Sequence, residues 1–560
     1  MKAKHTSKNQ SKPFNGRLSN SLYSIGQVIC IIVLTALSGI ALLYSANFGI
    51  LSGENYAEKP LLAYALNPDG LSQIAASVLG AAILLCLLFV VWKCKPGKCK
   101  PKVLLACVCA WVFIAQLIWV FSLNTQAYSF NDTISLSVAA QELLNGNLSA
   151  FSTGVESEGV FSPNFYFTLY PYQAGSMYLF VLIFALFGHE NYIAFQIVNA
   201  LANVVVVLCL FWIVKSYTNK VRTQNLCLVL CAVCTPLLMS CALIYGNTAG
   251  LMFSALALAL LTHGLKQQST KNKLIFVALS FVAIALAMVV KNTCIIFLIA
   301  MAILLIVEAI KNKSASLFVV TLVCALLAQQ AGGLPTKVLE AQTGANFGSG
   351  MPKTSWIAMG LRSDNPLETP GWWSMHAYNI YEECNGDSKA QSSMALSEIK
   401  DSIANFVVHP REGFNFFKTK LASEWAMPLY QTDYYSSSAM TGQNNEREYG
   451  SVAWDVLYRN STWPMRLFAD SYQLVVYFGA LAFAVMAWRM RKKKKVPSRC
   501  VLTLLPASIV LGFLVYALWE AKSIYTLPFF VLMLPLAAVA LNKLYEWFNG
   551  RMYYSNKKTE

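Results

Sequence analysis

The 560 residues are 56% hydrophobic and only 12% charged, with a mean hydropathy of +0.50. This composition excludes the soluble classes, whose surfaces need far more charge. The net charge of +16 would suit a nucleic-acid binder, but the basic residues stand in short clusters between apolar runs. Such clusters orient membrane helices, so we predict an integral membrane protein with membrane lipids and no nucleic acid as partners.

Apolar runs long enough to cross a bilayer, about 20 helical residues each, recur along the chain. Residues 1–24 lack the features of a cleavable signal, so we interpret the first run as an uncleaved start helix. The twelve predicted crossings are residues 25–47, 71–92, 103–123, 193–214, 225–244, 248–263, 274–290, 293–309, 316–331, 471–488, 500–518 and 524–545. A further stretch, Tyr172–Phe187, would make thirteen. The predicted fold class is an all-α polytopic membrane protein with about 12–13 transmembrane helices.

Basic loops decide between the two counts, because positive residues collect on the cytoplasmic side. Five lysines place the 93–102 loop in the cytoplasm, which leaves residues 123–192 outside. The later basic clusters, at 215–222, 266–273, 311–313, 489–495 and 543–558, all fall inside only if Tyr172–Phe187 does not cross. We therefore predict a re-entrant or surface-lying helix there, with both termini cytoplasmic.

This topology divides the chain into five segments. They are a cytoplasmic basic N-terminus (1–24), a transmembrane module with an exofacial catalytic loop (25–331, loop 123–192), an exofacial domain (332–470), C-terminal transmembrane helices (471–545) and a cytoplasmic tail (546–560). Residues 330–470 carry 15 of the 27 acidic residues against 11 Lys and Arg, a net of −4 that leaves +20 elsewhere. The asymmetry supports an extracellular position for this part, which we expect to be an α/β or mixed soluble domain.

Asp132 is the first candidate for chemistry, in the loop segment Ser129-Phe130-Asn131-Asp132-Thr133. A carboxylate just outside a helix end can act as a general base toward an acceptor hydroxyl. The alternative is an N-cap for a helix that begins near Thr133, a position that favours Asp. Spacing alone favours the cap.

An aromatic strip, residues 164–172, enters the apolar stretch that follows. Its polar and aromatic members Asn164, Tyr166, Tyr170 and Tyr172 suit stacking and hydrogen bonding to a sugar. Anchoring at the membrane interface explains the same residues equally well.

Two further hairpins place charge at helix mouths. Lys291 lies between two apolar helices on the predicted outer face, where it either binds a phosphate or snorkels to the interface. The last hairpin, Trp519–Tyr525, carries Glu520 and Lys522, for which a surface ion pair is the alternative. Acid and cations at one membrane surface indicate a reaction on a lipid-linked substrate, and no P-loop or dinucleotide glycine pattern is present in the sequence.

These motifs resemble the multispanning glycosyltransferases of the C superfamily, such as the protein O-mannosyltransferases and the lipid A aminoarabinose transferase, which use polyprenyl-phosphate sugars. Asn131-Asp132 followed by Ala139–Gly146 is similar to the family's acid and its A-x-x-L-x-x-G stretch. Tyr170-Pro171-Tyr172 with Phe187-Gly188 resembles its proline-containing juxtamembrane helix. Lys291 stands where the family often has a basic residue, and Glu520 to Tyr525 resembles a late E-x-x-R-Y hairpin, with Lys522 and Ile524 near the position of the arginine. The resemblance covers residues 103–330 and 471–545, so the first two helices look like an N-terminal addition.

The resemblance implies a hexosyl- or pentosyltransferase that moves a sugar from a polyprenyl-phosphate donor to a glycan, lipid or protein acceptor of the cell envelope, with inversion. Asp132 would be the catalytic base, and Lys291 and Lys522 would hold the donor phosphate. The expected substrate contacts are Asn164, Tyr166, Tyr170, Tyr172, Glu520 and Tyr525. We expect no cofactor and assign no metal ligands, although the reaction scheme is compatible with a divalent cation. The alternative function is a transporter or flippase, or a polymerase, of lipid-linked glycans.

Overall fold

The computed structural model describes residues 14–51, 57–64, 68–93, 99–128, 130–152, 162–362, 368–440, 450–459, 461–492 and 501–559. Its helices and strands in chain order are α1 (Phe14–Leu43), β1 (Tyr44–Asn47), β2 (Ile50–Leu51), β3 (Ala57–Glu58), β4 (Leu61–Tyr64), α2 (Pro68–Lys93), α3 (Pro101–Leu123), α4 (Asn131–Leu144), α5 (Pro163–Leu169), α6 (Ala174–Phe187), α7 (Tyr192–Tyr217), α8 (Val221–Ala232), α9 (Thr235–Met239), α10 (Asn247–Gly264), α11 (Thr270–Val290), α12 (Ile295–Asn312), α13 (Ala315–Ala331), α14 (Leu334–Thr343), α15 (Lys353–Gly360), α16 (His376–Glu383), α17 (Ser388–Val408), α18 (Pro410–Trp425), α19 (Thr432–Met440), α20 (Val452–Tyr458), α21 (Thr462–Lys492), α22 (Val501–Leu518) and α23 (Ser523–Thr559).

The helices confirm an all-α polytopic membrane protein. Within the described ranges, nine helices are long and apolar enough to cross a membrane, and they coincide with nine of the twelve predicted crossings. Of the other three, residues 225–244 are divided between α8 and α9 with a bend of 53°. The remaining two are the 18-residue α10 and the short apolar α22. The total of twelve crossings stays a prediction.

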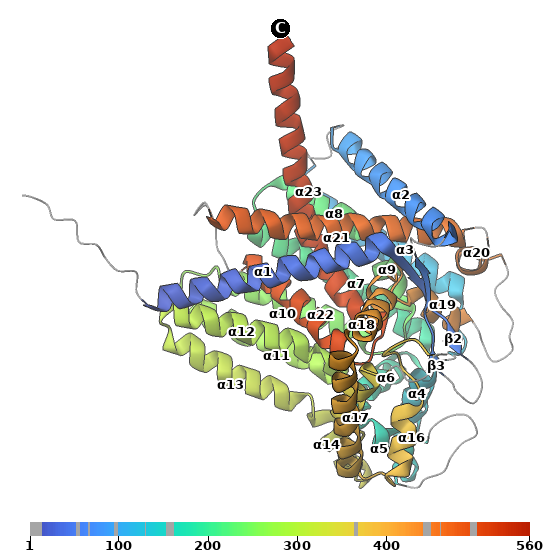
Figure 1. Ribbon diagram of the computed structural model, residues 1–560. Helices are drawn as coiled ribbons and strands as arrows, with labels where there is room; N and C mark the ends of the chain where they lie inside the picture. The colour runs from blue at the N-terminus through green and yellow to red at the C-terminus, as the bar shows by residue number, and fades with distance from the viewer. Residues whose placement is uncertain are drawn as a thin grey trace, which may run out of the picture.

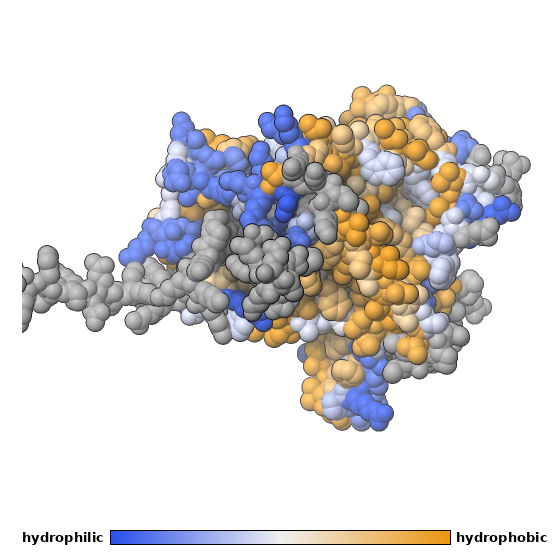
Figure 2. Space-filling model, turned by 90° about the horizontal axis from the view of Figure 1, so that it is seen from above, coloured by the Kyte–Doolittle hydropathy of each residue, from blue (hydrophilic) through white to orange (hydrophobic). Residues whose placement is uncertain are grey.

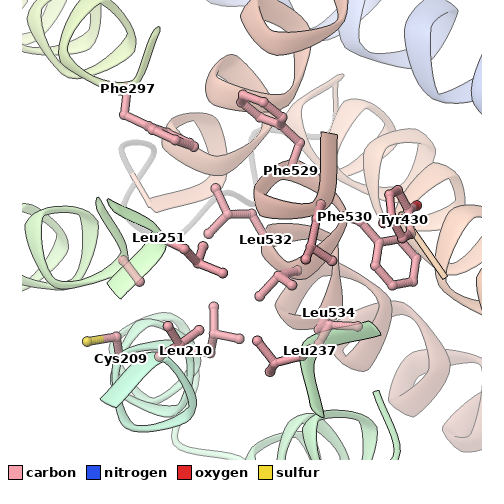
Figure 3. Packing of buried hydrophobic residues seen from close by; sticks show 14 of the residues in the cluster. Cys209, Leu210, Leu237, Leu251, Phe297, Tyr430, Phe529, Phe530, Leu532 and Leu534 are labelled. Carbon is pink, nitrogen blue, oxygen red and sulfur yellow. The ribbon is translucent and has the colours of Figure 1, made fainter. Parts of the chain in front are cut away.

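The long helices pack into one bundle, in which α1 lies beside α21 and α11 beside α13 (Figure 1). Helix α23 is its centre, since 89% of its most apolar 18-residue window is buried inside the protein, against 17% for α2. Phe529 and Phe530 of α23 point toward neighbouring helices in Figure 3, and the rings of Phe529 and Phe297 of α12 stack with centroids 5.1 Å apart. Figure 2 shows an apolar band across one face, with polar residues gathered on both sides, the pattern of a bilayer-embedded surface.

The part of residues 332–470 that the structure describes is helical, α14 to α20, so the expectation of an α/β or mixed domain is wrong there. Local sequence explains the outcome for α17, whose first half carries the helix-favouring residue types Ala, Lys, Gln, Met, Leu and Glu. Its start is capped by Asp387, whose carboxylate accepts hydrogen bonds from the backbone N–H groups of Lys389 and Ala390 at 2.8 and 3.3 Å. Strands occur instead between α1 and α2, where β1 pairs with β4 and β2 with β3, both antiparallel. We call this region, residues 44–64, the N-terminal strand segment.

The stretch Tyr172–Phe187 forms the 14-residue α6, preceded by a turn at Pro171. That length falls short of the roughly 20 residues of a full span. Helix α5 meets it at a bend of 109°, at the Tyr170-Pro171 step where proline cannot continue the preceding helix. The bend fits either a broken span or a re-entrant loop, so the re-entrant placement stays a prediction.

Candidate active-site cavity

A cavity of about 1070 Å³ lies where the helix ends meet residues 332–470. Its size is typical of sites for small ligands. Many stretches of chain that are distant in sequence contribute to its wall, and they include Glu58, Asp132, residues 170–173, 291–296, 329–340, 348–356, 373–378 and 515–522. Seven of the nine predicted site residues line it, namely Asp132, Tyr170, Tyr172, Lys291, Glu520, Lys522 and Tyr525.

Asp132 faces this cavity from the first turn of α4. The N-cap position belongs to Phe130 and no side chain caps the helix there, so the cap alternative is wrong. The helix begins two residues earlier than expected, at Asn131, and Thr133 anchors its first turn by donating its hydroxyl to the Ile244 carbonyl at 2.6 Å. A carboxylate in the first turn is stabilised by the helix dipole. Asp132 is thus open to a ligand in the cavity.

The two predicted residues outside the cavity wall both lie on α5. Tyr166 is buried, and its hydroxyl donates to Asp132 Oδ1 at 3.1 Å, so it supports the carboxylate from behind. Asn164 does not line the cavity, and its backbone carbonyl accepts the Thr168 hydroxyl at 2.8 Å. A substrate contact by Asn164 therefore has no support from its position.

Lys291 ends α11 and points its ammonium group at two aromatic rings. Its Nζ lies 4.3 Å from the centroid of the Tyr245 ring and 5.1 Å from that of Tyr525, which is cation–π geometry. Burial lowers the pKa of Lys291 to about 8, an effect that the Asp132 carboxylate partly offsets. Among the described residues Lys291 makes no ion pair. Its charge is therefore available to an anion in the cavity.

Lys522 is paired, and its partner is Glu58. The Lys522 ammonium lies 2.9 Å from Glu58 Oε1, and the two residues are 7% and 6% exposed. The alternative of a surface ion pair between Glu520 and Lys522 is therefore wrong. Glu520 is itself buried, and burial raises its pKa to about 7, although Lys522 acts in the opposite direction.

Sequence reasoning missed Glu58 because it lies in the N-terminal strand segment, outside the region of family resemblance. The fold brings it in through β3: the Glu58 N–H donates to the Trp373 carbonyl at 3.0 Å, and Ala57 pairs with Ser374 in a β-bridge. Trp372 in turn forms a bridge with Ala521, next to Lys522. No sequence signal marks this three-segment contact.

Lys420 is a second residue that the sequence did not single out. It is fully buried on α18, and its ammonium donates to three backbone carbonyls: Gly360 at 2.6 Å, Ala517 at 3.1 Å and Trp519 at 2.7 Å. Burial lowers its pKa to about 8. These bonds fix the end of α22 and the loop that carries Glu520 and Lys522. The sequence pattern of α18 could indicate that Lys420 is buried, but it could not reveal the three carbonyl groups to which its ammonium donates.

Metal ligands were not expected, and the described residues contain no group of three or more His, Cys, Asp or Glu side chains placed to hold a metal ion. The prediction that no cofactor is required stays a prediction.

Three solved structures are similar to this chain at low identity. The Archaeoglobus fulgidus oligosaccharyltransferase, tethered with an acceptor peptide containing the NVT sequon, aligns with a TM-score of 0.39 and 13% identity over 78% of this chain and 49% of that protein. Its apo form gives a TM-score of 0.39 and 11% identity over 80% and 52%. ArnT from Cupriavidus metallidurans bound to undecaprenyl phosphate gives 0.32 and 12% over 77% of each chain. Likenesses with TM-scores this low do not establish a common fold, and this chain spans about half the length of the archaeal enzyme.

A comparison of sequence families is more specific. No curated protein matches the chain. Residues 175–330 match the family model described as dolichyl-phosphate-mannose-protein mannosyltransferase. This stretch runs from α6 to α13 and includes Lys291. The resemblance to the C-superfamily membrane glycosyltransferases is therefore confirmed by a match to the dolichyl-phosphate-mannose-protein mannosyltransferase family over residues 175–330.

Proposed function

We propose that this chain is a membrane glycosyltransferase that moves a hexosyl or pentosyl group from a polyprenyl-phosphate donor to a hydroxyl of a cell-envelope acceptor, with inversion. The single observation that carries the proposal is the cavity, which brings Asp132, Lys291 and Lys522 together from three distant parts of the chain. A carboxylate base and cations around one ligand-sized space are the groups that such a transfer needs.

In the proposed reaction Asp132 accepts the proton of the acceptor hydroxyl. The acceptor oxygen forms a bond to the anomeric carbon, and the bond from that carbon to the phosphate oxygen breaks with its electron pair going to the phosphate. Lys291 and Lys522 offset the charge that develops on the leaving group. Lys291 carries the larger share, because Glu58 already offsets the charge of Lys522. The scheme requires no metal.

The aromatic lining supports a sugar ligand. Tyr170 and Tyr172 lie in the cavity wall with their ring centroids 6.3 Å apart. The centroid of the Tyr525 ring lies 5.1 Å from Lys291 Nζ and 5.9 Å from Lys522 Nζ. Aromatic faces bind the apolar side of sugar rings, while hydroxyl groups bond to their edges. We assign Tyr170, Tyr172, Glu520 and Tyr525 to substrate contact and Tyr166 to the support of Asp132.

The proposal includes an orientation. Residues 25–331 and 471–545 would form the transmembrane module, with the catalytic loop 123–192 and the domain 332–470 outside the cell and both termini in the cytoplasm. The charge asymmetry of the sequence supports it. The donor would reach the cavity from the outer leaflet, with its phosphate at the helix ends.

A transporter or flippase of lipid-linked glycans is the main rival. It predicts charged residues that face a cavity halfway along the spans. Here the charged residues assigned to the reaction lie at helix ends or between helices: Asp132 in a first turn, Lys291 after α11, and Glu520 and Lys522 between α22 and α23. The other charged residues of the wall lie on β3, on the short helix α14 and at the start of α15. This placement favours transfer at a membrane surface. A polymerase would differ mainly in the size of its acceptor, so it belongs to the same class of reaction.

Purified protein in proteoliposomes, supplied with a panel of polyprenyl-phosphate sugars and an extract of cell-envelope acceptors, tests the proposal. Two readouts are taken together: sugar attached to an acceptor, and lipid-linked sugar moved across the bilayer. We expect attachment without movement. Movement without attachment would instead establish the flippase.

A further inference from the structure

In the ion pair between Glu58 and Lys522, only one of the two carboxylate oxygens of Glu58 has a hydrogen-bond partner among the described residues. Glu58 Oε1 bonds to the lysine at 2.9 Å, but among the described residues the buried Oε2 atom has no hydrogen-bond partner. A buried carboxylate oxygen without a donor costs free energy, and a buried ion pair gains little over its desolvation cost unless its remaining lone pairs are bonded. The two charges are therefore close together, but the ion pair contributes little net stabilisation.

Backbone contacts hold the two partners close together. Glu58 is held on β3 by its bond to Trp373, and Lys522 follows Ala521, which bridges to Trp372. Both side chains start from one small patch of extended backbone. Glu58 consequently competes with any anion that approaches Lys522.

The charge of the phosphate changes during the proposed reaction. The donor is a phosphodiester with one negative charge. When its bond to the anomeric carbon breaks, the phosphate keeps the electron pair and becomes a monoester, which carries nearly two negative charges at neutral pH because its second pKa is about 6. The product needs more positive charge around it than the donor does.

Around the Tyr525 ring the cavity has one lysine without an ion pair among the described residues, Lys291, and one whose charge is already offset, Lys522. Lys337 of α14 and Lys353 of α15 also line the cavity. The carboxyl groups of Asp132 and Glu520 also line the cavity and, when ionised, add negative charge there. Around Tyr525 the arrangement suits a monoanionic phosphate better than a dianionic one. We infer that Glu58 is a built-in counter-ion of Lys522 that limits the affinity of the cavity for phosphate monoesters and so favours release of the lipid-phosphate product.

This inference rests on the proposed function for its place in the reaction, but it is tested by binding alone. The probes are farnesyl phosphate, a monoester, and methyl farnesyl phosphate, its monoanionic diester. Their affinities are measured for the full chain in nanodiscs, for wild type and Glu58→Gln. The matched control is Lys59→Gln, which changes a charge on the next residue, outside the cavity wall.

We expect Glu58→Gln to bind the monoester about tenfold more tightly than wild type, the scale of one close charge pair, with a much smaller gain for the diester. Adding Lys522→Met should abolish the gain, and Lys59→Gln should change neither affinity. Equal gains for both probes, or weaker binding of the monoester, would overturn the inference. Should Glu58→Gln fail to fold, Glu58→Asp, which shortens the reach to Lys522, must shift the two affinities in the same directions by smaller factors.

The two proposals fail separately. If Glu58→Gln gains affinity selectively for the monoester but the protein never transfers sugar, the proposed function is refuted and the counter-ion role of Glu58 stands. If the protein transfers sugar but Glu58→Gln shows no selective gain, the counter-ion role of Glu58 is refuted and the proposed function stands.

Discussion

Lys291 meets a phosphate with full charge only over part of the pH range. Burial lowers its pKa to about 8, so the ammonium form is present below that value and is lost as the pH rises through it. We predict that kcat/KM for the donor falls above about pH 8. In Lys291→Arg the fall should move to much higher pH, because a guanidinium group stays charged. A pH profile of both proteins checks this, and an alkaline fall that stays at the same pH in the arginine variant would rule Lys291 out as the phosphate-binding cation.

The hydrogen bond from Tyr166 to Asp132 can be tested by removing the tyrosine hydroxyl. Its hydroxyl donates to the carboxylate at 3.1 Å, and loss of one hydrogen bond to a charged group is worth about 1.5–3 kcal/mol. We predict that Tyr166→Phe lowers kcat about tenfold or more and leaves the donor KM nearly unchanged.

The matched control for this variant is Tyr192→Phe, which removes a hydroxyl that bonds to Ser137 on the same helix α4, at 3.0 Å, away from the cavity. Steady-state kinetics of both variants separate the two cases. Equal losses in both would mean that Tyr166 only stabilises α4.

At the scale of elements, Lys420 decides how the loop after α22 is held. Its ammonium is the donor to three carbonyls, at Gly360, Ala517 and Trp519. Lys420→Met leaves these groups buried without their donor, so we predict a loss of about 3 kcal/mol or more in the free energy of unfolding. The neighbouring Lys418→Met removes a partly exposed lysine that bonds only to the Asn415 side chain among the described residues, and should change stability by about 0.5 kcal/mol at most. Denaturant unfolding in detergent measures both, and similar values for the two variants would contradict the role given to Lys420.

The elements also show where sequence reasoning succeeds and fails. Hydropathy locates the spanning helices because burial in lipid and burial in protein both require apolar side chains. For the same reason it cannot tell the central α23 from the peripheral α2. Charge at helix ends pointed to Asp132, Lys291 and Lys522 because such charge is costly near a membrane and is a candidate for function. Which partner cannot be read locally: Glu58 reaches Lys522 across more than 400 residues, through backbone bridges that leave no periodic pattern.

For the molecule as a whole, the N-terminal helices are more than an addition to a family module. Between α1 and α2 the chain supplies Glu58 to the cavity, and Ser45 on β1 donates its hydroxyl to Asp470 of α21 at 2.9 Å. The Ala46 N–H donates to the Ala426 carbonyl at 2.9 Å, just after α18. Helix α1 also packs against α21 and α22. We predict that a chain lacking residues 1–67 loses phosphate-ester binding even if it inserts in the membrane, because the contacts to α21, α22 and the end of α18 that hold the cavity wall are lost, and this outweighs the removal of Glu58. The farnesyl phosphate assay checks this, and binding equal to that of the full chain would contradict this account.

The central claim is that one cavity performs sugar transfer with Asp132 as its base, and the most direct measurement is the yield of both products from purified protein. Wild type should release polyprenyl phosphate and glycosylated acceptor in equal amounts. The rate of Asp132→Asn, still folded, should fall by a factor of about 10²–10⁴, whereas Glu142→Gln, which removes a partly exposed carboxylate from the same helix, should keep the wild-type rate. Transfer by Asp132→Asn at a rate near that of wild type would contradict the account.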